Sequence, residues 1–448
     1  MNMTDEKTDK ENREFTRRTF MGAVAVVGAG AVLASCKKSY PPVAFVDVAP
    51  DGPVLKAGLI GCGSRGTGAA LNYLKAGPNL KIVALADVLH DHMDTCRENL
   101  AQKAQVQVAD DHCFIGFDAY KKVLEADVDV ALLATPPHFR PQHFDAAVDA
   151  KKHIFMEKPC AVDAPGVRSV LATGQKAATY NLCVVSGTLW RHDRPHRETY
   201  NRVSHGAIGE IVSARSRYNV GQLWYTPRKK GWSDMEAMIR DWVNWRWLSG
   251  DHIVEQDVHN LNTVLWLTGM LPTKAIAAGG RVQRVTGDQF DHFNVQYSYP
   301  NGGIWDSMCR QIDGCANEVS DLVIGTEGYT NCKDTIYDLK GKVVWQYQEP
   351  GQDPGKTKFN PYDQEHVDFV HAIRTNQPMN ESEHLAQSTL IGILGRTAAY
   401  TGKEVKWDEM MDSQERLGPA ECAMGPVAIK AEIPVPGNAE NIAKHARA

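Results

Sequence analysis

The sequence predicts an α/β protein of two domains, the first built on a doubly wound parallel sheet. Its 448 residues exceed what a single hydrophobic core ordinarily organises. Between residues 54 and 160, short apolar runs typical of strands buried on both faces alternate with helix-like segments. A glycine-rich turn joins the first of these strands to a helix, which is the start expected of a nucleotide-binding α/β unit.

That turn has the spacing G-x-G-x-x-G, between a predicted strand at 55–60 and a predicted helix at 67–75. The first glycine permits the tight turn, the second lets the backbone approach a pyrophosphate, and the third lets helix and strand pack closely. The helix N-terminus then points at the anion. This context distinguishes a dinucleotide site from a chance run of glycines. The predicted contacts are Gly61, Gly63, Ser64, Arg65 and Gly66.

A second predicted strand, residues 81–86, ends at Asp87, which lies 21 residues beyond Gly66. A carboxylate at this spacing accepts hydrogen bonds from the ribose hydroxyls of NAD and repels a 2′-phosphate. The predicted cofactor is therefore NAD. NADP stays open as the alternative, since a basic side chain near Asp87 could accommodate its phosphate.

Two further buried strands, at 128–135 and 152–156, end in segments rich in polar groups, with a predicted helix at 141–150 between them. Ligands of doubly wound sheets collect at such carboxyl ends of strands. The cofactor contacts predicted from these segments are Thr135, Pro136, His138, His143, Glu157 and Lys158.

Several of these residues carry a resemblance to a known family. The run T-P-P-H at 135–138 with His143, and the run K-H-I-F-M-E-K-P at 152–159, resemble the Gfo/Idh/MocA oxidoreductases. The segments G-A-I-G-E-I at 206–211 and T-G-K-E-V at 401–405 are also similar to that family. The resemblance implies a Rossmann domain followed by an α/β domain with an open, mostly antiparallel sheet, acting on sugars, polyols or glycosides.

The resemblance also implies a catalytic role for Lys158, whose counterpart lies near the nicotinamide and the reacting hydroxyl. An ammonium there would favour alkoxide character on the substrate oxygen as hydride leaves carbon. The alternative is an ordinary surface lysine beyond a strand.

Glu255 and His259 are four residues apart, so a helix would present both on one face. The family commonly has Asp-x-x-x-His here, with the histidine as base for the substrate hydroxyl. This chain departs from it in carrying Glu255 for the aspartate and Asp257 where a glycine is frequent. We predict His259 as general base, since its pKa lies near operating pH, and Glu255 as its orienting partner or a sugar contact. A metal is not expected, because no third ligand cluster is apparent.

The substrate site is predicted to include aromatic and polar side chains from the second domain. Four tryptophans could belong either to a core or to the sugar site. Trp245 and Trp247 are expected to seal a core, whereas Trp224 and Trp242 could pack in a core or stack on a pyranose. The predicted substrate contacts are Arg191, His192, Tyr218, Trp224, Tyr225, Trp242, Asp257 and His259.

Composition excludes several other classes of protein. The chain is 43% apolar and 23% charged, with a net charge of −5, and has no basic patch with interleaved aromatics, so no nucleic-acid partner is expected. Ten cysteines without a C-x-x-C pair indicate neither a zinc ribbon nor a disulfide framework.

Residues 1–36 are predicted to be an export signal rather than part of the fold. The segment T-R-R-T-F-M at 16–21 resembles a twin-arginine signal, and the apolar stretch after it is too short to span a bilayer. L-A-S-C at 33–36 resembles a lipobox, which predicts lipidation of Cys36; cleavage nearby with Cys36 incidental is the alternative. The protein is thus expected in the periplasm or as a membrane-anchored lipoprotein, with the membrane contacted only through Cys36.

The predicted division of the chain follows from these segments. It runs 1–36 signal, 37–53 tether, 54–180 Rossmann NAD-binding domain, 181–412 substrate-binding α/β domain and 413–448 C-terminal arm or loose tail. Such arms sometimes join protomers, and a homo-oligomer is expected.

Export restricts the kinds of reaction that are expected, because no pool of electron acceptors that would reoxidise NADH is evident outside the cytoplasm. The leading hypothesis is hydride transfer from a sugar or glycoside hydroxyl to tightly bound NAD, with the cofactor regenerated by a second carbohydrate. A glycosidase cycle of oxidation, elimination, water addition and re-reduction is the second, with Asp257, Tyr218 and Tyr225 as candidate bases. A lipid-tethered, non-catalytic carbohydrate-binding protein is the third.

Overall fold

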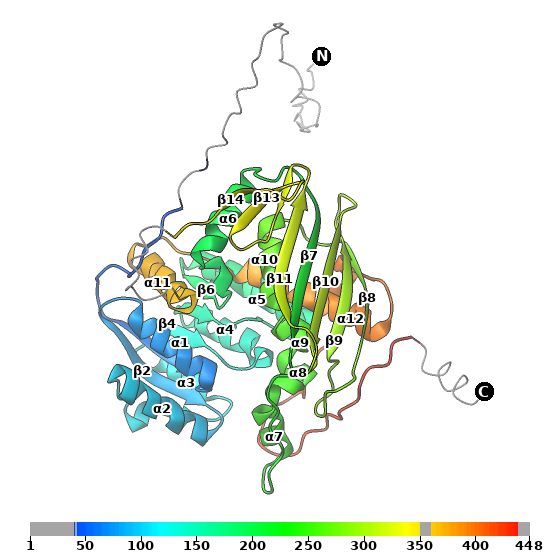
Figure 1. Ribbon diagram of the computed structural model, residues 1–448. Coiled ribbons are helices and arrows are strands. Elements are labelled where there is room, and N and C mark those ends of the chain that lie inside the picture. The colour runs from blue at the N-terminus through cyan, green and yellow to red at the C-terminus, as the bar shows by residue number, and fades with distance from the viewer. Residues whose placement is uncertain (1–39, 41–42, 350–359, 438–448) are drawn as a thin grey trace, which may run out of the picture. The chain divides into compact units, whose positions relative to one another are not determined.

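The computed structural model describes Tyr40, residues 43–349 and residues 360–437 (Figure 1). The predicted export signal and Cys36 lie outside the described residues. Within the described part of the chain, no helix combines the length and the apolar character needed to cross a bilayer.

The first sheet has six strands, all parallel, in the order β3-β2-β1-β4-β5-β6. This order reverses between β1 and β4, so the carboxyl ends of these two strands form the switch point where nucleotides bind. The predicted parallel sheet is confirmed. Its strands are β1 Leu55–Ile60, β2 Leu80–Asp87, β3 Cys113–Ile115, β4 Val130–Leu133, β5 His153–Met156 and β6 Val184–Ser186.

Helices cover both faces of this sheet, and two separate groups of buried apolar side chains lie beneath them. One face carries α1 Ser64–Lys75, α2 His90–Ala104 and, from late in the chain, α11 Pro361–Arg374. The other face carries α3 Ala119–Glu125, α4 Arg140–Asp149 and α5 Ala164–Thr179. The short helices η1 Asp110–His112 and η2 Pro137–Phe139 lie in the loops.

The boundary predicted at residue 180 is wrong. Strand β6, Val184–Ser186, falls beyond that boundary but belongs to the first sheet, where it pairs in parallel with β5. The run is too short and too apolar for its sequence to show which sheet it joins.

The second sheet has nine strands in the order β14-β13-β12-β11-β7-β10-β9-β8-β15, and only the β7–β10 pair of the described strands is parallel. The predicted open, mostly antiparallel sheet is confirmed. Its strands are β7 Ile211–Val220, β8 Lys274–Gly280, β9 His292–Ser298, β10 Ile304–Gln311, β11 Glu318–Gly325, β12 Gly328–Thr330, β13 Thr335–Asp338, β14 Val343–Gln346 and β15 Val405–Lys406.

Two long helices, α10 Val258–Thr268 and α12 Ser382–Thr401, pack against one face of this sheet (Figure 1). They bury the inward-facing side chains of the strands, which alternate with more exposed ones along β10. The remaining helices are η3 Leu189–Arg191, α6 Arg194–Ser204, α7 Asp234–Arg240, η4 Trp242–Asn244, α8 Arg246–Ser249, α9 His252–Glu255 and α13 Trp407–Asp412.

The segment predicted to be a tether is part of the fold from residue 43 onward, which corrects that prediction. Ala49 is 2% exposed, and its N–H donates to Ala76. The Phe45 ring lies 5.2 Å from the guanidinium carbons of both Arg194 and Arg197 on α6. Cation–π packing of this kind fixes a segment that its proline-rich sequence suggested was loose.

The C-terminal arm also packs on the chain over its described length. The Leu417 N–H donates to Asp163, the Val427 N–H to Asp234, and the Gly437 N–H to Thr401, with no helix or strand after α13.

The glycine turn has a strict packing requirement at its third glycine. A Cβ built on Gly66 would lie 1.8 Å from the carbonyl oxygen of Gly61, which is backbone and has no room to move. A Cβ on Gly68, two residues along the same helix, would meet nothing closer than the Arg65 Nη1 at 3.5 Å.

We therefore predict that Gly66→Ala lowers the free energy of unfolding by about 1–3 kcal/mol, the usual cost of an overpacked site. The matched control Gly68→Ala should leave stability unchanged or raise it by up to about 1 kcal/mol, because alanine favours the helix. Urea unfolding of both variants measures this. Equal stability of the two variants would contradict it.

Candidate active site

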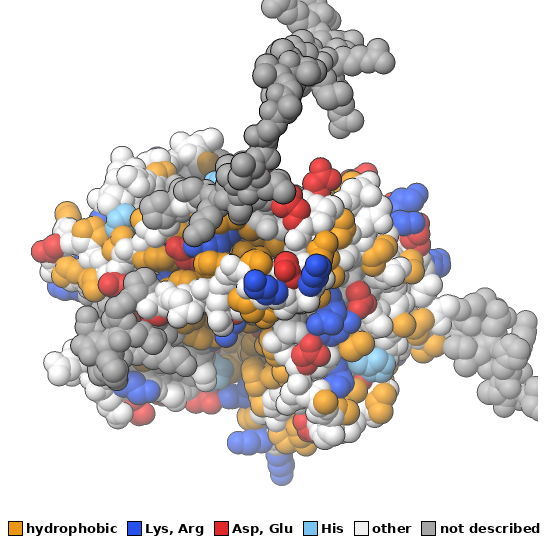
Figure 2. Space-filling view, turned by 45° about the horizontal axis from the view of Figure 1, so that its top comes forward, with side chains coloured by type: hydrophobic (Ala, Val, Ile, Leu, Met, Phe, Trp, Pro, Cys, Tyr) orange, Lys and Arg blue, Asp and Glu red, His pale blue; other side chains and the backbone are white. Residues whose placement is uncertain are grey.

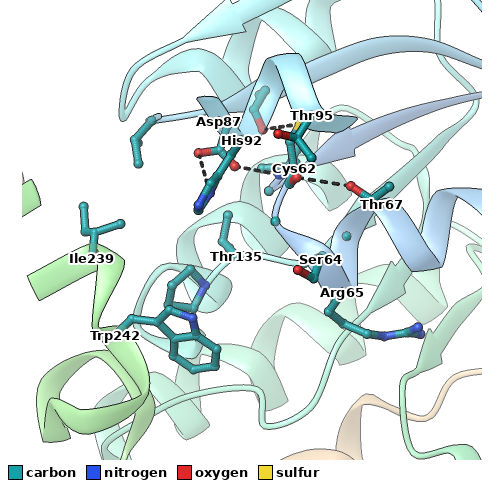
Figure 3. Close-up of a pocket in the computed structure, with 18 of the residues that line it drawn as sticks. Cys62, Ser64, Arg65, Thr67, Asp87, His92, Thr95, Thr135, Ile239 and Trp242 are labelled. Carbon is teal, nitrogen blue, oxygen red and sulfur yellow. Dashed lines mark hydrogen bonds and ion pairs between the residues drawn. The ribbon is translucent and has the colours of Figure 1, made fainter. Parts of the chain in front are cut away.

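A cavity of about 840 Å³ opens at the carboxyl ends of β1, β2 and β4. Its lining includes all five predicted turn residues, Asp87, Thr135, Pro136 and His143 (Figure 3). Figure 2 shows a hollow on this side of the molecule whose visible walls are mainly hydrophobic. The space matches a dinucleotide in size, since small-molecule sites usually occupy about 300–1,000 Å³.

The glycine turn leaves an anion-binding surface at one end of the cavity. Helix α1 is preceded by Gly63, has no side-chain cap and carries no acidic residue in its first turn. A Cβ on Gly63 would meet only the His92 ring, at 4.0 Å, so a diphosphate could approach the backbone closely. The uncapped N–H groups and the helix dipole both favour a negative charge there, which fits the predicted cofactor.

Asp87 is fixed at the tip of β2 by two backbone donors. The Cys62 N–H donates to its Oδ2 at 2.6 Å, and the Leu89 N–H to its Oδ1 at 2.9 Å. His92, which the sequence reasoning missed, lies with its Nδ1 3.7 Å from Oδ1. Hydrogen bonding to Asp87 raises the pKa of His92, whose ring lies beside the predicted ribose site.

Thr135 and His143 lie together on the cavity wall, with Thr135 Oγ1 3.1 Å from His143 Nδ1. Burial lowers the pKa of His143 to about 3, so the ring is neutral. His138 is placed differently from the prediction. It packs edge-on against Trp247 with ring centroids 4.9 Å apart and does not line the cavity, which makes its assignment as a cofactor contact wrong.

Lys158 and Glu255 form an ion pair between the two domains. The ammonium donates to Glu255 Oε1 at 2.8 Å and to the Glu255 carbonyl oxygen at 2.6 Å. Both side chains are mostly buried, at 12% and 7% exposed. Lys158 follows the end of β5 in the first domain, and Glu255 is the last residue of α9 in the second. The pair therefore fixes the ammonium at the boundary between the two domains.

The glutamate before Lys158 is bound by the glycine turn. The Arg65 Nε donates to Glu157, and the Arg65 Nη2 donates to Glu365 of α11 at 2.8 Å. The guanidinium also lies 4.7 Å from the ring centre of Tyr362. The carboxylate of Glu157 is therefore occupied by a residue of the cofactor helix rather than free for the cofactor.

His259 does not share a helix with Glu255, contrary to the prediction. Helix α9 ends at Glu255 and α10 begins at Val258, so a break separates the two. The carboxylate of Glu255 binds Lys158 rather than the imidazole. The half-buried His259 ring instead packs against Trp190, with centroids 5.4 Å apart, and within the described ranges it has no hydrogen-bond partner.

The environment keeps His259 neutral. Burial lowers the pKa of the imidazole well below its usual value, and the positive charges of Lys158 and Arg65 lower it further. The charges of both cations therefore act on the imidazole. A neutral ring can accept a proton, but its lowered pKa makes it a weaker base than an ordinary histidine.

Gln256 and Tyr218 extend the ion pair into the second sheet. The Gln256 amide donates to Glu255 Oε2 at 2.5 Å, and the Tyr218 hydroxyl donates to Gln256 Oε1 at 3.0 Å. Burial raises the pKa of Tyr218 to about 12. Tyr218 therefore lies beside the ion pair, and Gln256 is an addition that no pattern indicated.

Arg191 and His192 belong to a buried charged cluster beneath the site. His192, 1% exposed, binds Asp368 at 2.8 Å, and the Arg191 Nε donates to Glu381 at 3.3 Å. Although burial opposes its charge, the carboxylates of Glu381 and Asp368 raise the pKa of His192 to about 10. His192 is a structural cation, and its prediction as a substrate contact is wrong.

The prediction of Asp257 as a substrate contact or base is also wrong. Its side chain is 0% exposed and accepts a hydrogen bond from Ser307 of β10 at 3.0 Å. Burial raises its pKa to about 7. The sequence shows only an extra carboxylate beside the predicted base, whereas in the structure the side chain is buried in the core.

The tryptophans occupy two different environments, the hydrophobic core and the nucleotide cavity. Trp247 is 2% exposed, as expected for a core residue. Trp224 and Trp242 line the nucleotide cavity, with ring centroids 6.3 Å apart, so the structure does not bring them to the Lys158 ion pair as sugar contacts. Tyr225 is 52% exposed and does not line that cavity.

Comparison with known proteins identifies the first domain. Residues 55–184 match the Gfo/Idh/MocA family model, described as an oxidoreductase family with an NAD-binding Rossmann fold. The nucleotide-binding domain belongs to this family. Membership confirms the resemblance seen in the sequence and NAD as the cofactor of the domain.

Curated relatives are distant. A "Glycosyl hydrolase family 109 protein 4" of Phocaeicola vulgatus is 25% identical over 303 residues, 65% of this chain and 55% of the relative. A "dTDP-3,4-didehydro-2,6-dideoxy-alpha-D-glucose 3-reductase" of Actinomadura kijaniata is 25% identical over 37% of this chain and 46% of the relative. The chain spans about half the length of these relatives.

Solved structures of similar fold cover about four fifths of this chain. A scyllo-inositol dehydrogenase of Lactobacillus casei with NAD(H) and scyllo-inositol is 20% identical with a TM-score of 0.59, covering 79% of this chain and 99% of that one. An aldose-aldose oxidoreductase of Caulobacter crescentus is 18% identical with a TM-score of 0.60 and the same coverage. At these identities the likeness concerns the fold alone.

We predict that Lys158→Met raises the pKa of His259 toward its ordinary value, because the variant removes a neighbouring positive charge. Titration of the imidazole by NMR in the purified full chain measures the change. Lys152→Met is the matched control, since Lys152 precedes the same strand but its ammonium bonds the Val128 carbonyl. An unchanged His259 pKa in Lys158→Met would show that the two groups do not face one another.

Proposed function

We propose that this protein is an NAD-dependent oxidoreductase that transfers hydride from a sugar or glycoside CH–OH group. The observation that carries the proposal is the mostly buried ion pair that Lys158 forms with Glu255 between an NAD-binding domain and a second domain. The charge of the same ammonium helps to lower the pKa of the His259 imidazole. The names of the relatives add the carbohydrate class of the substrate.

The roles of the residues follow from their chemistry. Bound NAD supplies the hydride acceptor. Lys158, fixed by two oxygens of Glu255, donates a hydrogen bond to the substrate oxygen and stabilises the negative charge that develops on it. His259, neutral and without a competing hydrogen bond among the described residues, accepts the hydroxyl proton. Gln256 and Tyr218 hold the glutamate and hence the ammonium in place.

The expected result is that the purified full chain binds NAD and that some glycosides raise the reduced-nicotinamide absorbance. His259→Ala should lower this rate by about 10²–10⁴-fold, the usual contribution of a positioned base. His205→Ala, which changes an exposed histidine, is the control and should retain the wild-type rate. Bound NAD with no absorbance change for any sugar would contradict the proposal and favour a carbohydrate-binding protein.

A glycosidase cycle is the second candidate, because several relatives carry the name glycosyl hydrolase family 109. That cycle needs a base for the carbon-bound proton. Asp257 is buried, and burial raises the pKa of Tyr218 to about 12, so neither favours it. Mass analysis of the products separates the cases: keto-sugar marks net oxidation, and released aglycone marks hydrolysis.

We also propose export by the twin-arginine route and lipidation at Cys36, on the basis of the segments at 16–21 and 33–36. A homo-oligomer is part of the same proposal. Cys36→Ser should shift the protein from the membrane to the soluble fraction of the cells that produce it, as measured by fractionation and immunoblotting. Equal partition of the variant and the wild type would contradict the anchor.

A further inference from the structure

The nucleotide cavity is walled in part by the second domain. Five of its lining residues come from the segment between β7 and α8, whereas the others come from the first domain. Figure 3 shows Ile239 and Trp242 across the cavity from Ser64 and Arg65. The five are Trp224, Thr226, Ile239, Arg240 and Trp242.

This wall is joined to the first domain by an ion pair. Arg240, the last residue of α7, donates from Nη1 to Asp91 Oδ2 at 2.8 Å and from Nη2 to Asp91 Oδ1 at 3.1 Å. Asp91 lies in the first turn of α2, four residues beyond Asp87. Two-point arginine–carboxylate pairing has a defined direction, so it fixes the distance between α7 and α2.

Two neighbouring side chains orient the Arg240 guanidinium toward Asp91. Its Nε donates to Glu236 Oε1 at 2.9 Å, and its guanidinium lies 4.8 Å from the ring centre of Trp232. Hydrogen bonding to Arg240 lowers the pKa of Asp91, which keeps the carboxylate charged. Only 17% of the arginine side chain is exposed, so part of the pair is shielded from water.

The base of the wall is fixed as well. Asp241, 3% exposed, accepts hydrogen bonds at Oδ1 from the Thr226 N–H and the Asn244 amide, both at 2.8 Å. The Asn244 side chain in turn accepts from buried Arg284. Ile239 and Trp242 are therefore presented by a braced segment rather than by a loose loop.

We propose that Ile239, Arg240 and Trp242 complete the dinucleotide site from the second domain, and that the Arg240–Asp91 pair retains the nucleotide through turnover. The proposal rests on the proposed NAD chemistry and deepens it. A cofactor regenerated within each cycle has no need to leave, and a wall closed by an ion pair slows its release. Such contacts act mainly on the dissociation rate.

The test is the rate at which NADH leaves the full-length protein. NADH-loaded protein is mixed with excess NAD, and the loss of nicotinamide fluorescence is followed. Asp91→Asn and Arg240→Gln should each release NADH about five-fold faster, as expected for one exposed to half-buried ion pair. The double variant should be no faster than either single one, since both remove the same interaction.

Arg228→Gln is the matched control. Arg228 lies on the same segment and pairs with Asp234 at 2.7 Å, but it does not line the cavity or reach α2. Its NADH release should match the wild type. A second readout needs no change in the ion pair: energy transfer from tryptophan to NADH should fall in Trp242→Phe and stay unchanged in Trp345→Phe on β14.

Wild-type release rates in both Asp91→Asn and Arg240→Gln, or equal acceleration in Arg228→Gln, would overturn the role of the ion pair. Undiminished energy transfer in Trp242→Phe would overturn the composite wall. These outcomes are independent of sugar chemistry: if NADH release behaves as expected while no sugar is oxidised, the proposed reaction fails and the assignment of the nucleotide site stands.

Discussion

The ion pair between Lys158 and Glu255 is the contact on which the rest of the site depends. It crosses from the end of β5 to the end of α9, so the two domains must be docked for it to form. Burying either charge alone would be costly, and breaking such a pair typically costs about 3–5 kcal/mol. The same contact that joins the domains thus holds an ammonium, oriented by two oxygens, whose charge helps to keep the His259 imidazole neutral.

Glu255, at a position where the family resemblance implies an aspartate, has a structural effect here. Glu255 occupies the last position of a short helix and reaches the ammonium with both its carbonyl and its carboxylate. The histidine four residues later lies in the first turn of a new helix and is left without a carboxylate partner among the described residues. Its pKa is set by burial and by the nearby cations rather than by an orienting acid.

Much of the fold could be predicted from the sequence because its signals are local. β1 occupies Leu55–Ile60 as predicted, and β5, His153–Met156, lies within the predicted strand at 152–156. The failures concern side-chain direction and long-range partners. No pattern near Asp257 shows that it faces β10, and none near His192 shows carboxylates 176 and 189 residues later in the chain. Likewise, Trp224 and Trp242 reach the nucleotide cavity through tertiary structure alone.

The position of α11 on the first sheet has a consequence for biosynthesis. Val367, Phe369 and Val370 of this helix share a buried cluster with Tyr73 of α1 and Phe155 of β5. When the nucleotide-binding half leaves the ribosome, the part of this face that α11 covers therefore stays exposed until about 190 further residues have been made. The packing of this face is complete only when translation has nearly ended.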